Sequence, residues 1–424
     1  MGYTIVEKIM AKAAGKDAVR IGEILDVAVD RLFINDFLGP IVASQFKSLE
    51  LPMAFDADRV LFGLDHRVPP ADVKSANNHI IIRDFCGQYG IERLHDIGRH
   101  GIGHQLMIEH YTLPGEVALG TDSHATMYGG LGALACGITS SDAAVILATG
   151  KIWLQVPPTI RINIVGTLRR GVTAKDLSLA MIKLAPLNTL INKALEIGGE
   201  GARALSVSGR LVLANMAAEM GVKCALVEAD EKTAEFVSQP PEALDLLRPD
   251  PDAGYEAVYT LDAAQIEPLI ACPHSVENIE PVAQIAGLEV HQAFLGSCTN
   301  GRIEDFEQAL EILDGRRVHK NVRLLVVPAS QEVMLEAARK GYVERLLTAG
   351  AAIMTPSCAS CAGAGPGLIG DGERAVCTTN RNFKGRMGSP DGEVYLASAY
   401  VVAASAVKGR LCDPREFLLD KEGG

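Results

Sequence analysis

Residues 323–354 read RLLVVPASQEVMLEAARKGYVERLLTAGAAIM, and this stretch decides the fold class. It opens on the stretch Arg323–Pro328, apolar after its first residue, which predicts a strand buried on both faces. A helix is predicted over Gln331–Lys340, and a second short strand over Ala351–Met354. A buried strand, a helix and another strand in this order are typical of α/β proteins with largely parallel sheets.

The same alternation continues along the rest of the chain. Further strands are predicted at Val60–Leu64, Val117–Leu119, Ile160–Val165, Val222–Val227 and Val290–Phe294. Further helices are predicted at Ile5–Ala14 and Thr173–Leu184, and a run of small residues predicts helix from Gly132 to Gly150. Polar motifs follow several of these strands directly. The carboxyl ends of strands are where open α/β sheets bind their ligands.

The composition describes a large, acidic, globular chain. The 424 residues allow about two to four domains, and a hydrophobic fraction of 48% excludes general disorder. The net charge of −12 argues against nucleic-acid binding through the overall charge, whereas a local cluster of arginines still suits an anionic substrate. The sequence shows no secretory h-region and no apolar stretch long enough to span a bilayer. We therefore expect a cytoplasmic protein without a membrane segment.

Three of the nine cysteines lie in motifs rich in small residues. Cys298 follows a predicted strand, and Cys358 and Cys361 form a C-x-x-C whose sulfurs can reach one small cluster. Four interpretations stay open: three ligands for a [4Fe–4S] cluster with one open iron, a cluster fully ligated with Cys377, a zinc site, or a redox dithiol. The other cysteines are predicted to be buried packing residues, namely Cys86, Cys136, Cys224, Cys272 and Cys412.

Three histidines at the ends of predicted strands form a candidate acid–base set. His66 and His124 have carboxylates close by in the sequence, Asp65 and Asp122, and His104 is the third member. A single histidine is more often a packed or surface residue. Three at strand ends are better explained as groups that hold and transfer protons near neutral pH.

Two further groups are candidates for binding a substrate or orienting a histidine. Arg381, Lys384 and Arg386 lie in one short stretch, and each arginine can bind a carboxylate in a bidentate way. A solvated basic loop is the alternative. Asn215 and Glu219 are predicted one turn apart on the same helix face, from which Glu219 can orient an imidazole. An exposed helix glutamate is the alternative there.

Taken in order, these motifs resemble the aconitase/isopropylmalate dehydratase superfamily over nearly the whole chain. The ordered set is Leu64-Asp65-His66, Gly103-His104-Gln105, Gly120-Thr121-Asp122-Ser123-His124, Gly296-Ser297-Cys298-Thr299-Asn300, Pro356-Ser357-Cys358-x-x-Cys361 and Asn380-Arg381-Asn382-Phe383-x-Gly385-Arg386. Each motif alone is weakly specific, whereas the ordered set is very specific. The resemblance is strongest to the large subunits of the superfamily's two-subunit dehydratases.

The resemblance implies a three-layer α/β/α fold with three similar domains, here 1–160, 161–283 and 284–424, around a central [4Fe–4S] cluster. The residues that match the cluster ligands are Cys298, Cys358 and Cys361. Those that match neighbours of the cluster are Asn215, Asn300 and Asn380. Catalytic positions are matched by Asp65, His66, His104, Asp122, His124 and Glu219. Substrate contacts are matched by Asn35, Ser123, Arg381 and Arg386.

The resemblance also implies an activity. It is that of a hydro-lyase, which interconverts 2-isopropylmalate and 3-isopropylmalate by dehydration and rehydration at the cluster, in leucine biosynthesis. A homoaconitase and a methylmalate- or dimethylmalate-type dehydratase are the alternatives within the class. An iron–sulfur protein that binds RNA is the alternative from another class. Asn35 and Leu38 stand where isopropylmalate dehydratases usually have His and Thr, so the alkyl group of the substrate stays open.

A partner is implied as well. In these dehydratases a swivelling domain on a separate small subunit supplies a serine base and further arginines, and no such domain is found in this sequence. We therefore expect a heterodimer or heterotetramer with that small subunit. The expected substrate is a small 2-hydroxy di- or tricarboxylic acid.

Overall fold

The computed structural model describes residues 2–185, 190–240, 244 and 247–418. The chain divides into two compact units that alternate along the sequence. Unit 1 comprises residues 1–99, 103–165 and 185–261, and unit 2 comprises residues 100–102, 166–184 and 262–424. Among the described residues, no helix is both long and apolar enough to cross a membrane.

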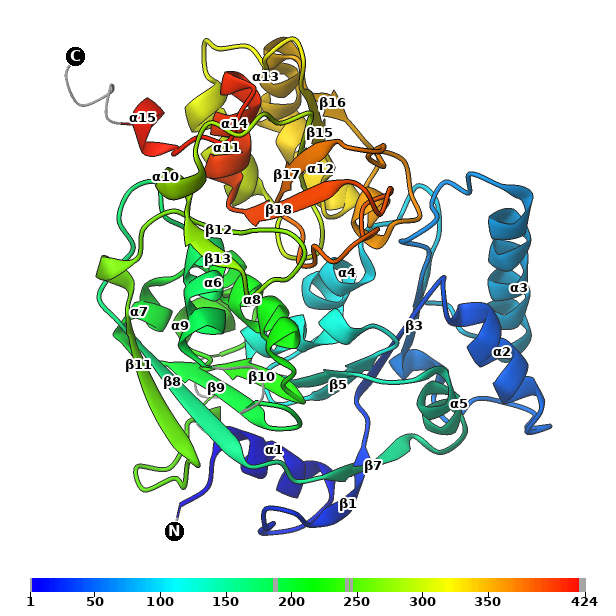
Figure 1. Cartoon of the computed structure of the whole chain (residues 1–424). Helices are drawn as coiled ribbons and strands as arrows, with labels where there is room; N and C mark the ends of the chain where they lie inside the picture. Colours follow the sequence, from blue (N-terminus) through cyan, green and yellow to red (C-terminus); the bar gives the residue numbers. More distant parts are fainter. Residues whose placement is uncertain (1, 186–189, 241–243, 245–246, 419–424) are drawn as a thin grey trace. The chain divides into compact units, whose positions relative to one another are not determined.

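Unit 1 is built around a parallel sheet of five strands in the order β4-β3-β2-β5-β6. Figure 1 labels two of these strands, β3 and β5. The strands are β2 (Arg31–Asn35), β3 (Val60–Gly63), β4 (Leu94–His95), β5 (Val117–Gly120) and β6 (Leu134–Gly137). The helices are α2 (Gly39–Lys47), η1 (Ala57–Arg59), α3 (Val73–Tyr89), α4 (Gly103–His110), η2 (Ser123–Leu131) and α5 (Ser140–Thr149). Strands β3 and β5 are buried along their whole length, as expected when helices cover both faces of a parallel sheet.

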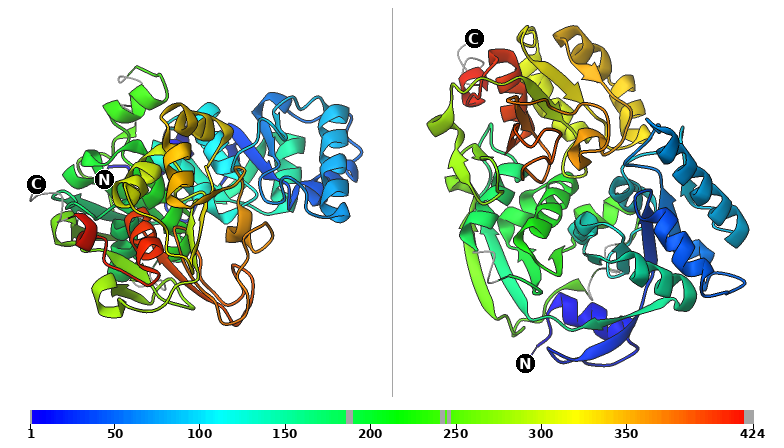
Figure 2. Two further views of the ribbon diagram at one scale, coloured as in Figure 1. Left: turned by 90° about the horizontal axis from the view of Figure 1, so that it is seen from above. Right: turned by 45° about the vertical axis from the view of Figure 1, so that its right-hand side comes forward.

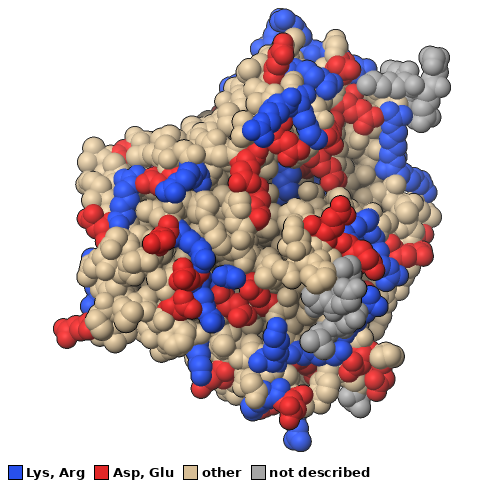
Figure 3. All heavy atoms as spheres, turned by 180° about the vertical axis from the view of Figure 1, so that it is seen from behind, with Lys and Arg blue, Asp and Glu red and all other residues tan. Residues whose placement is uncertain are grey.

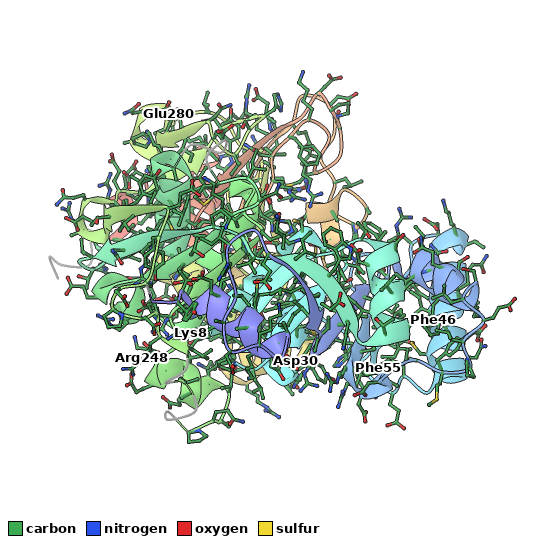
Figure 4. All side chains as sticks on the ribbon, turned by 90° about the horizontal axis from the view of Figure 1, so that it is seen from below. Lys8, Asp30, Phe46, Phe55, Arg248 and Glu280 are labelled. Atoms are coloured by element: carbon green, nitrogen blue, oxygen red, sulfur yellow. The ribbon has the colours of Figure 1, made fainter. Side chains whose placement is uncertain are left out.

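Aromatic packing joins the sheet to its helices. Helices α2 and α3 lie side by side in both views of Figure 2. Phe85 of α3 packs with its ring centre 5.8 Å from Phe46 of α2 and 5.7 Å from Phe62 of β3, and all three rings are buried. Figure 4 labels Phe46 in this helical layer. Each fully buried ring contributes about 1.5–3 kcal/mol to the stability of the fold.

The strand order of this sheet reverses between β2 and β5. The chain runs from β2 outward to β3 and β4, then returns to β5 and β6 on the other side. In open parallel sheets, ligands bind at the carboxyl ends of the strands next to such a reversal. Asp36 follows β2, Asp122 follows β5 shortly after it ends, and His66 follows β3. The topology therefore gathers these side chains at one edge.

Two smaller sheets complete unit 1. The first has the order β10-β9-β8-β11, and its strands are β8 (Thr159–Val165), β9 (Ala194–Gly198), β10 (Cys224–Val227) and β11 (Ala257–Asp262). The second is the antiparallel pair β1 (Ile24–Ala28) and β7 (Lys151–Gln155). The accompanying helices are α1 (Ile5–Ala13), α7 (Glu200–Ala204), α8 (Val207–Met216), η4 (Ala217–Met220) and α9 (Glu231–Phe236). Helix α8 packs closely against η2, next to the loop that carries Asp122.

Unit 2 contains a seven-stranded sheet in the order β13-β12-β18-β17-β14-β15-β16. Its strands are β12 (Leu269–Ala271), β13 (Ile279–Pro281), β14 (Gln292–Leu295), β15 (Arg323–Val326), β16 (Ala352–Ile353), β17 (Arg374–Cys377) and β18 (Glu393–Ala397). The strands from β18 to β16 pair in parallel, whereas β12 is antiparallel to both of its neighbours. The helices are α6 (Ala174–Leu184), η6 (Ala263–Gln265), α10 (Val282–Ile285), α11 (Ile303–Leu313), α12 (Gln331–Arg339), α13 (Tyr342–Ala349), η7 (Ala359–Ala362), α14 (Ala399–Lys408) and α15 (Arg415–Leu418).

This second sheet also reverses its strand order, between β14 and β17. The chain moves from β14 to β15 and β16, and then returns to β17 and β18 on the other side. The same rule therefore predicts a ligand site at the carboxyl ends of β14 and β17. Cys298 lies in the loop after β14, and Asn380 lies in the loop after β17.

The predicted α/β class with largely parallel sheets is confirmed. The decisive stretch forms β15, α12 and β16, each within a few residues of its predicted position. The helix predicted from Gly132 to Gly150 is wrong in its first part. There Leu134–Gly137 pairs with β5 as strand β6, because pairing within the sheet outweighs the helix preference of small residues. The division into three domains stays a prediction, and its boundary at residue 160 falls inside β8.

Candidate active site

Unit 1 brings the predicted histidines and carboxylates together. His66 Nδ1 lies 2.7 Å from Asp65 Oδ1, and Asp65 Oδ2 accepts the backbone N–H of Gly103 at 2.9 Å. Because Nδ1 is directed at a carboxylate, it carries a proton and leaves Nε2 to react. His66 Nε2 lies 3.9 Å from Asp122 Oδ2. Position 103 requires glycine, since a Cβ atom there would overlap the ring of Phe33.

Asp122 connects the other two histidines. Its Oδ1 lies 3.2 Å from His104 Nε2 and 3.2 Å from His124 Nδ1, and it accepts the backbone N–H of His124 at 2.8 Å. The far nitrogen of His124, Nε2, lies 2.8 Å from Glu219 Oε1. On the other side, His104 Nδ1 contacts the hydroxyl of Tyr128 at 2.9 Å. A series of alternating carboxylates and imidazoles results, in which the rings of His104 and His124 are each held through both nitrogens.

The electrostatics of this chain follow from burial and hydrogen bonding. Burial acts to raise the pKa of Asp122, but hydrogen bonds from His104 and His124 outweigh it and hold the pKa well below its usual range. Burial acts to lower the pKa of His124, but Asp122 and Glu219 outweigh it and raise the pKa. Burial raises the pKa of the Asp65 carboxyl. Hydrogen bonds therefore fix the positions of the negative charge on Asp122 and of the proton on His124.

Sequence reasoning missed two residues behind His66. Asp36 accepts the backbone N–H groups of His66 and Arg67 at 3.0 and 2.9 Å, and its Oδ1 lies 3.3 Å from His66 Nδ1. His79 on α3 places Nε2 3.5 Å from the other oxygen of Asp36. Both side chains are buried. The position of Asp36 directly after β2 was a usable signal, whereas nothing in the sequence marks His79, which lies inside a helix.

Three other predicted residues lie in unit 1. The side-chain amide of Asn35 donates to the carbonyl of Thr121 at 3.2 Å, and its Oδ1 accepts the N–H of Leu38 at 2.9 Å, so Asn35 ties the end of β2 to the end of β5. Ser123 is exposed and, with Asp122, lines a pocket of about 790 Å³. Asn215 is fully buried in the last turn of α8. Their roles toward a substrate or cluster stay predictions.

Unit 2 brings two of the predicted cysteines to one asparagine. The amide of Asn380 donates to Cys298 Sγ at 3.2 Å, and Cys361 Sγ lies 3.5 Å from Asn380 Oδ1. Cys358 directly precedes the short helix η7 and Cys361 lies within it, and the N–H of Cys361 donates to the carbonyl of Cys358 at 3.0 Å. Cys298 follows β14, the pair Cys358 and Cys361 follows β16, and Asn380 follows β17.

The residues present fit a three-cysteine iron–sulfur cluster. Such a cluster needs sulfur ligands surrounded by small residues and by donors that hydrogen-bond to sulfur. Asn380 is such a donor, and the buried hydroxyl of Ser360, which can also donate, finds no partner among the described residues. Cys377 is fully buried, and its sulfur contacts Thr379 Oγ1 at 3.0 Å instead. All nine cysteines are described, and none forms a disulfide.

The two predicted substrate arginines differ in their surroundings. Arg386 stacks over the ring of Phe383 at 5.5 Å, and its buried Nε finds no acceptor in the part of the chain that the structure describes. Arg381 follows Asn380 directly and is half-buried. A guanidinium held on an aromatic face with an unused donor is suited to a carboxylate. The assignment of both arginines to substrate binding stays a prediction.

Comparisons with known proteins find matches over nearly the full length of the chain. The model of the aconitase family (aconitate hydratase) matches residues 7–409. A protein of Methanothermobacter thermautotrophicus named "Probable 3-isopropylmalate dehydratase large subunit" is 44% identical over 416 residues, which cover 98% of this chain and 99% of that protein. A protein of Methanopyrus kandleri named "3-isopropylmalate dehydratase large subunit 1" is 44% identical over 420 residues, which cover 99% of this chain and all of that protein.

Among solved structures, the chain resembles the holo form of Thermococcus kodakaraensis aconitase X. The TM-score is 0.51 at 12% identity, and the match covers 89% of each chain. At that identity the likeness concerns the fold alone. It agrees with the parallel α/β sheets described above.

Proposed function

This chain belongs to the aconitase family, and from that premise we propose that it is the large subunit of a 3-isopropylmalate dehydratase. Its relatives at 44% identity carry that name over their whole length. The observation that carries the proposal is the pairing of two sets of residues in one chain. One is the carboxylate–imidazole chain of unit 1, and the other is the set of cysteines around Asn380 in unit 2.

Proteins of this family carry a [4Fe–4S] cluster. We assign its ligands to Cys298, Cys358 and Cys361, with Asn380 donating a hydrogen bond to the first of these sulfurs. When bound, the cluster supplies a Lewis-acid iron that polarises the hydroxyl and a carboxylate of the substrate. The neighbouring Asn300 has a buried amide oxygen without a partner among the described residues, and we assign Asn300 and Asn215 to the surroundings of the cluster.

The proposed reaction needs a proton for the departing hydroxyl. His66 is the proton donor in this proposal, because Asp65 fixes its Nδ1 and leaves Nε2 to act. Asp122, His104, His124 and Glu219 keep the neighbouring charges and protons in place. A residue positioned for general acid catalysis contributes about 10²–10⁴-fold in rate.

The substrate in this proposal is a 2-hydroxy acid with two carboxylates. Arg381 and Arg386 bind those carboxylates, and Ser123 and Asn35 contribute polar contacts. Arg386 supports this role through its unused Nε donor.

On the face drawn in Figure 3, acidic and basic side chains are interspersed, whereas recognition of RNA favours a continuous basic patch.

The relatives are named large subunits, so the proposed enzyme includes a small subunit as partner. We propose that this partner carries the swivelling domain with the base that removes the carbon-bound proton. The complex is then a heterodimer or heterotetramer. The pathway is leucine biosynthesis, in which 2- and 3-isopropylmalate are interconverted.

The test is turnover by the reconstituted pair. The chain is loaded with iron and sulfide without oxygen, mixed with a small subunit, and supplied with 3-isopropylmalate. Ultraviolet absorption should report the alkene, and chromatography should detect 2-isopropylmalate. Turnover of a homocitrate- or methylmalate-type acid in place of isopropylmalate would transfer the proposal to that substrate. If the pair dehydrates no 2-hydroxy acid while holding a full cluster, the proposed function is wrong.

A further inference from the structure

Lys175, in the first turn of α6, is a lysine without any solvent-exposed surface. Lysines are almost never fully buried unless hydrogen bonds satisfy the ammonium group. Its Nζ donates to two successive backbone carbonyls, those of Thr378 at 3.1 Å and Thr379 at 2.6 Å. These acceptors lie more than 200 positions further along the chain but in the same unit.

The two carbonyls explain where strand β17 ends. In an extended strand, successive carbonyls point to opposite sides. Two successive carbonyls that converge on one ammonium therefore require the chain to leave the strand conformation, and β17 ends at Cys377, directly before them. The next two residues are Asn380 and Arg381. The ammonium thus sets the path along which these two side chains are presented.

The same carbonyl joins this segment to the loop of Cys298. The carbonyl of Thr378 also accepts the hydroxyl of Thr299 at 2.7 Å, and Thr299 follows Cys298 directly. The hydroxyl of Thr378 in turn donates to the carbonyl of Gly296 at 2.8 Å and accepts its N–H at 2.9 Å. Lys175 therefore supports both loops that meet at the hydrogen bond from Asn380 to Cys298.

The residue next to Lys175 fixes the helix itself. Asp176 is fully buried and accepts the N–H groups of Leu269 at 2.9 Å and Thr173 at 2.8 Å. The start of α6 is thereby fastened to β12. Lys175 extends from this anchored position to the carbonyls of Thr378 and Thr379, so its ammonium holds that segment at a fixed distance from α6.

We propose that Lys175 is a positioning residue for the cluster: its ammonium holds the segment from Thr378 to Arg381, and with it the amide of Asn380 beside Cys298 and Cys361. It also keeps one positive charge behind the loops that hold the cluster. The inference rests on the proposed function, because it takes the three cysteines as the ligands of a [4Fe–4S] cluster.

The test compares Lys175→Met with a matched control on the same helix, Lys183→Met. Lys183 Nζ also donates to a backbone carbonyl, that of Ile279 at 3.4 Å, but Ile279 lies on β13 at the far edge of the sheet. Each full-length variant is reconstituted without oxygen. Iron per chain, the rate of iron loss in air, and the midpoint potential of the cluster are then measured, together with the melting temperature.

Lys183→Met should match the parent protein in iron content, rate of iron loss and potential. Lys175→Met should lose iron several-fold faster, and its potential should shift to a more negative value, because net charge near a cluster sets its potential. A purely structural role would lower only the melting temperature. If Lys175→Met keeps the parental rate of iron loss and the parental potential, the proposal is overturned.

A second variant covers the case in which Lys175→Met does not fold. Thr299→Val removes the other hydrogen bond to the carbonyl of Thr378 and leaves the buried charge in place. It should also accelerate iron loss without the shift in potential, and an unchanged rate of loss would overturn the proposal. Failure of the parent protein to bind iron at all would instead contradict the proposed function, so the two failures are distinguishable.

Discussion

Replacing Asp36 by asparagine tests whether the position of His66 depends on the Asp36 carboxylate, which no sequence motif marks. Asp36 accepts two backbone N–H groups, from His66 and Arg67, and contacts the rings of His66 and His79. In Asp36→Asn, one oxygen becomes an NH₂ group that faces an N–H donor. One buried hydrogen bond is lost and the other loses its charge.

The magnitude follows from those contacts. A hydrogen bond to a charged group contributes about 1.5–3 kcal/mol, so the free energy of unfolding should fall by about 2–4 kcal/mol. The backbone and ring of His66 also lose their support. Since general acid catalysis contributes about 10²–10⁴-fold, a partly misplaced His66 should lower kcat by about 10- to 100-fold. Denaturant unfolding and turnover of 3-isopropylmalate by the reconstituted pair measure the two effects.

The same variant should change the acid side of the stability profile. Burial acts to raise the pKa of Asp36, but hydrogen bonds from His66 and His79 outweigh it, so the folded pKa lies below the usual value. A depressed carboxylate pKa stabilises the fold above the unfolded pKa, near 4, and this contribution is lost as the pH falls through the folded pKa. As the pH falls below about 4, the free energy of unfolding of Asp36→Asn should therefore decrease less than that of the parent protein.

Asp30→Asn is the matched control. Asp30, labelled in Figure 4, lies at the opposite end of β2, and its carboxylate accepts the N–H of Val117 at 2.9 Å. This variant should be destabilised by about 1.5–3 kcal/mol, with kcat unchanged. If Asp36→Asn is destabilised to the same degree and keeps kcat within a factor of about two, Asp36 is a structural residue only and the reasoning is refuted.

Four further variants test the ligand assignment, the contact between Glu219 and His124, and the buried carboxyl of Asp176. Cys361→Ser should lose the cluster, whereas Cys377→Ser, whose sulfur contacts Thr379, should keep about four iron per chain; equal iron in both would contradict the ligand assignment. Glu219→Gln removes a partner that raises the pKa of His124, so that pKa should fall in an NMR titration, and an unchanged value would contradict the geometry. Burial raises the pKa of Asp176 to about 6, so stability should decrease as the pH rises from about 4 to about 6. Asp176→Asn should abolish that slope, and a slope that persists would assign it to another group.

The fold and the site differ in how much of them the sequence predicts. Strand β15 was predictable because it lies in an apolar run, and helix α12 because its apolar residues, such as Val333 and Ala337, recur at helical spacing after the capping residue Ser330. Strand β6 was not, because Leu134–Gly137 becomes a strand only through pairing with β5. The contact between Glu219 and His124 depends on the packing of α8 against η2, which no local pattern encodes.

The supporting residues were harder still to foresee. His79 and Lys175 lie inside helices, where a histidine or lysine usually faces solvent. Their burial is decided by what packs on the helix: Asp36 in the first case, and the carbonyls of Thr378 and Thr379 in the second. Motifs identify the groups that perform the chemistry, whereas the groups that position them are found only in the folded chain.

In the proposed function, His66 and the carboxylates and imidazoles around it serve the reaction at the iron–sulfur cluster. The most direct measurement is the kcat of His66→Gln with 3-isopropylmalate, in the reconstituted pair, after iron per chain has been matched to the parent protein. His66→Gln should hold a full cluster of about four iron and show a kcat about 10²–10⁴-fold lower. A variant with a full cluster and parental kcat would contradict this role of His66.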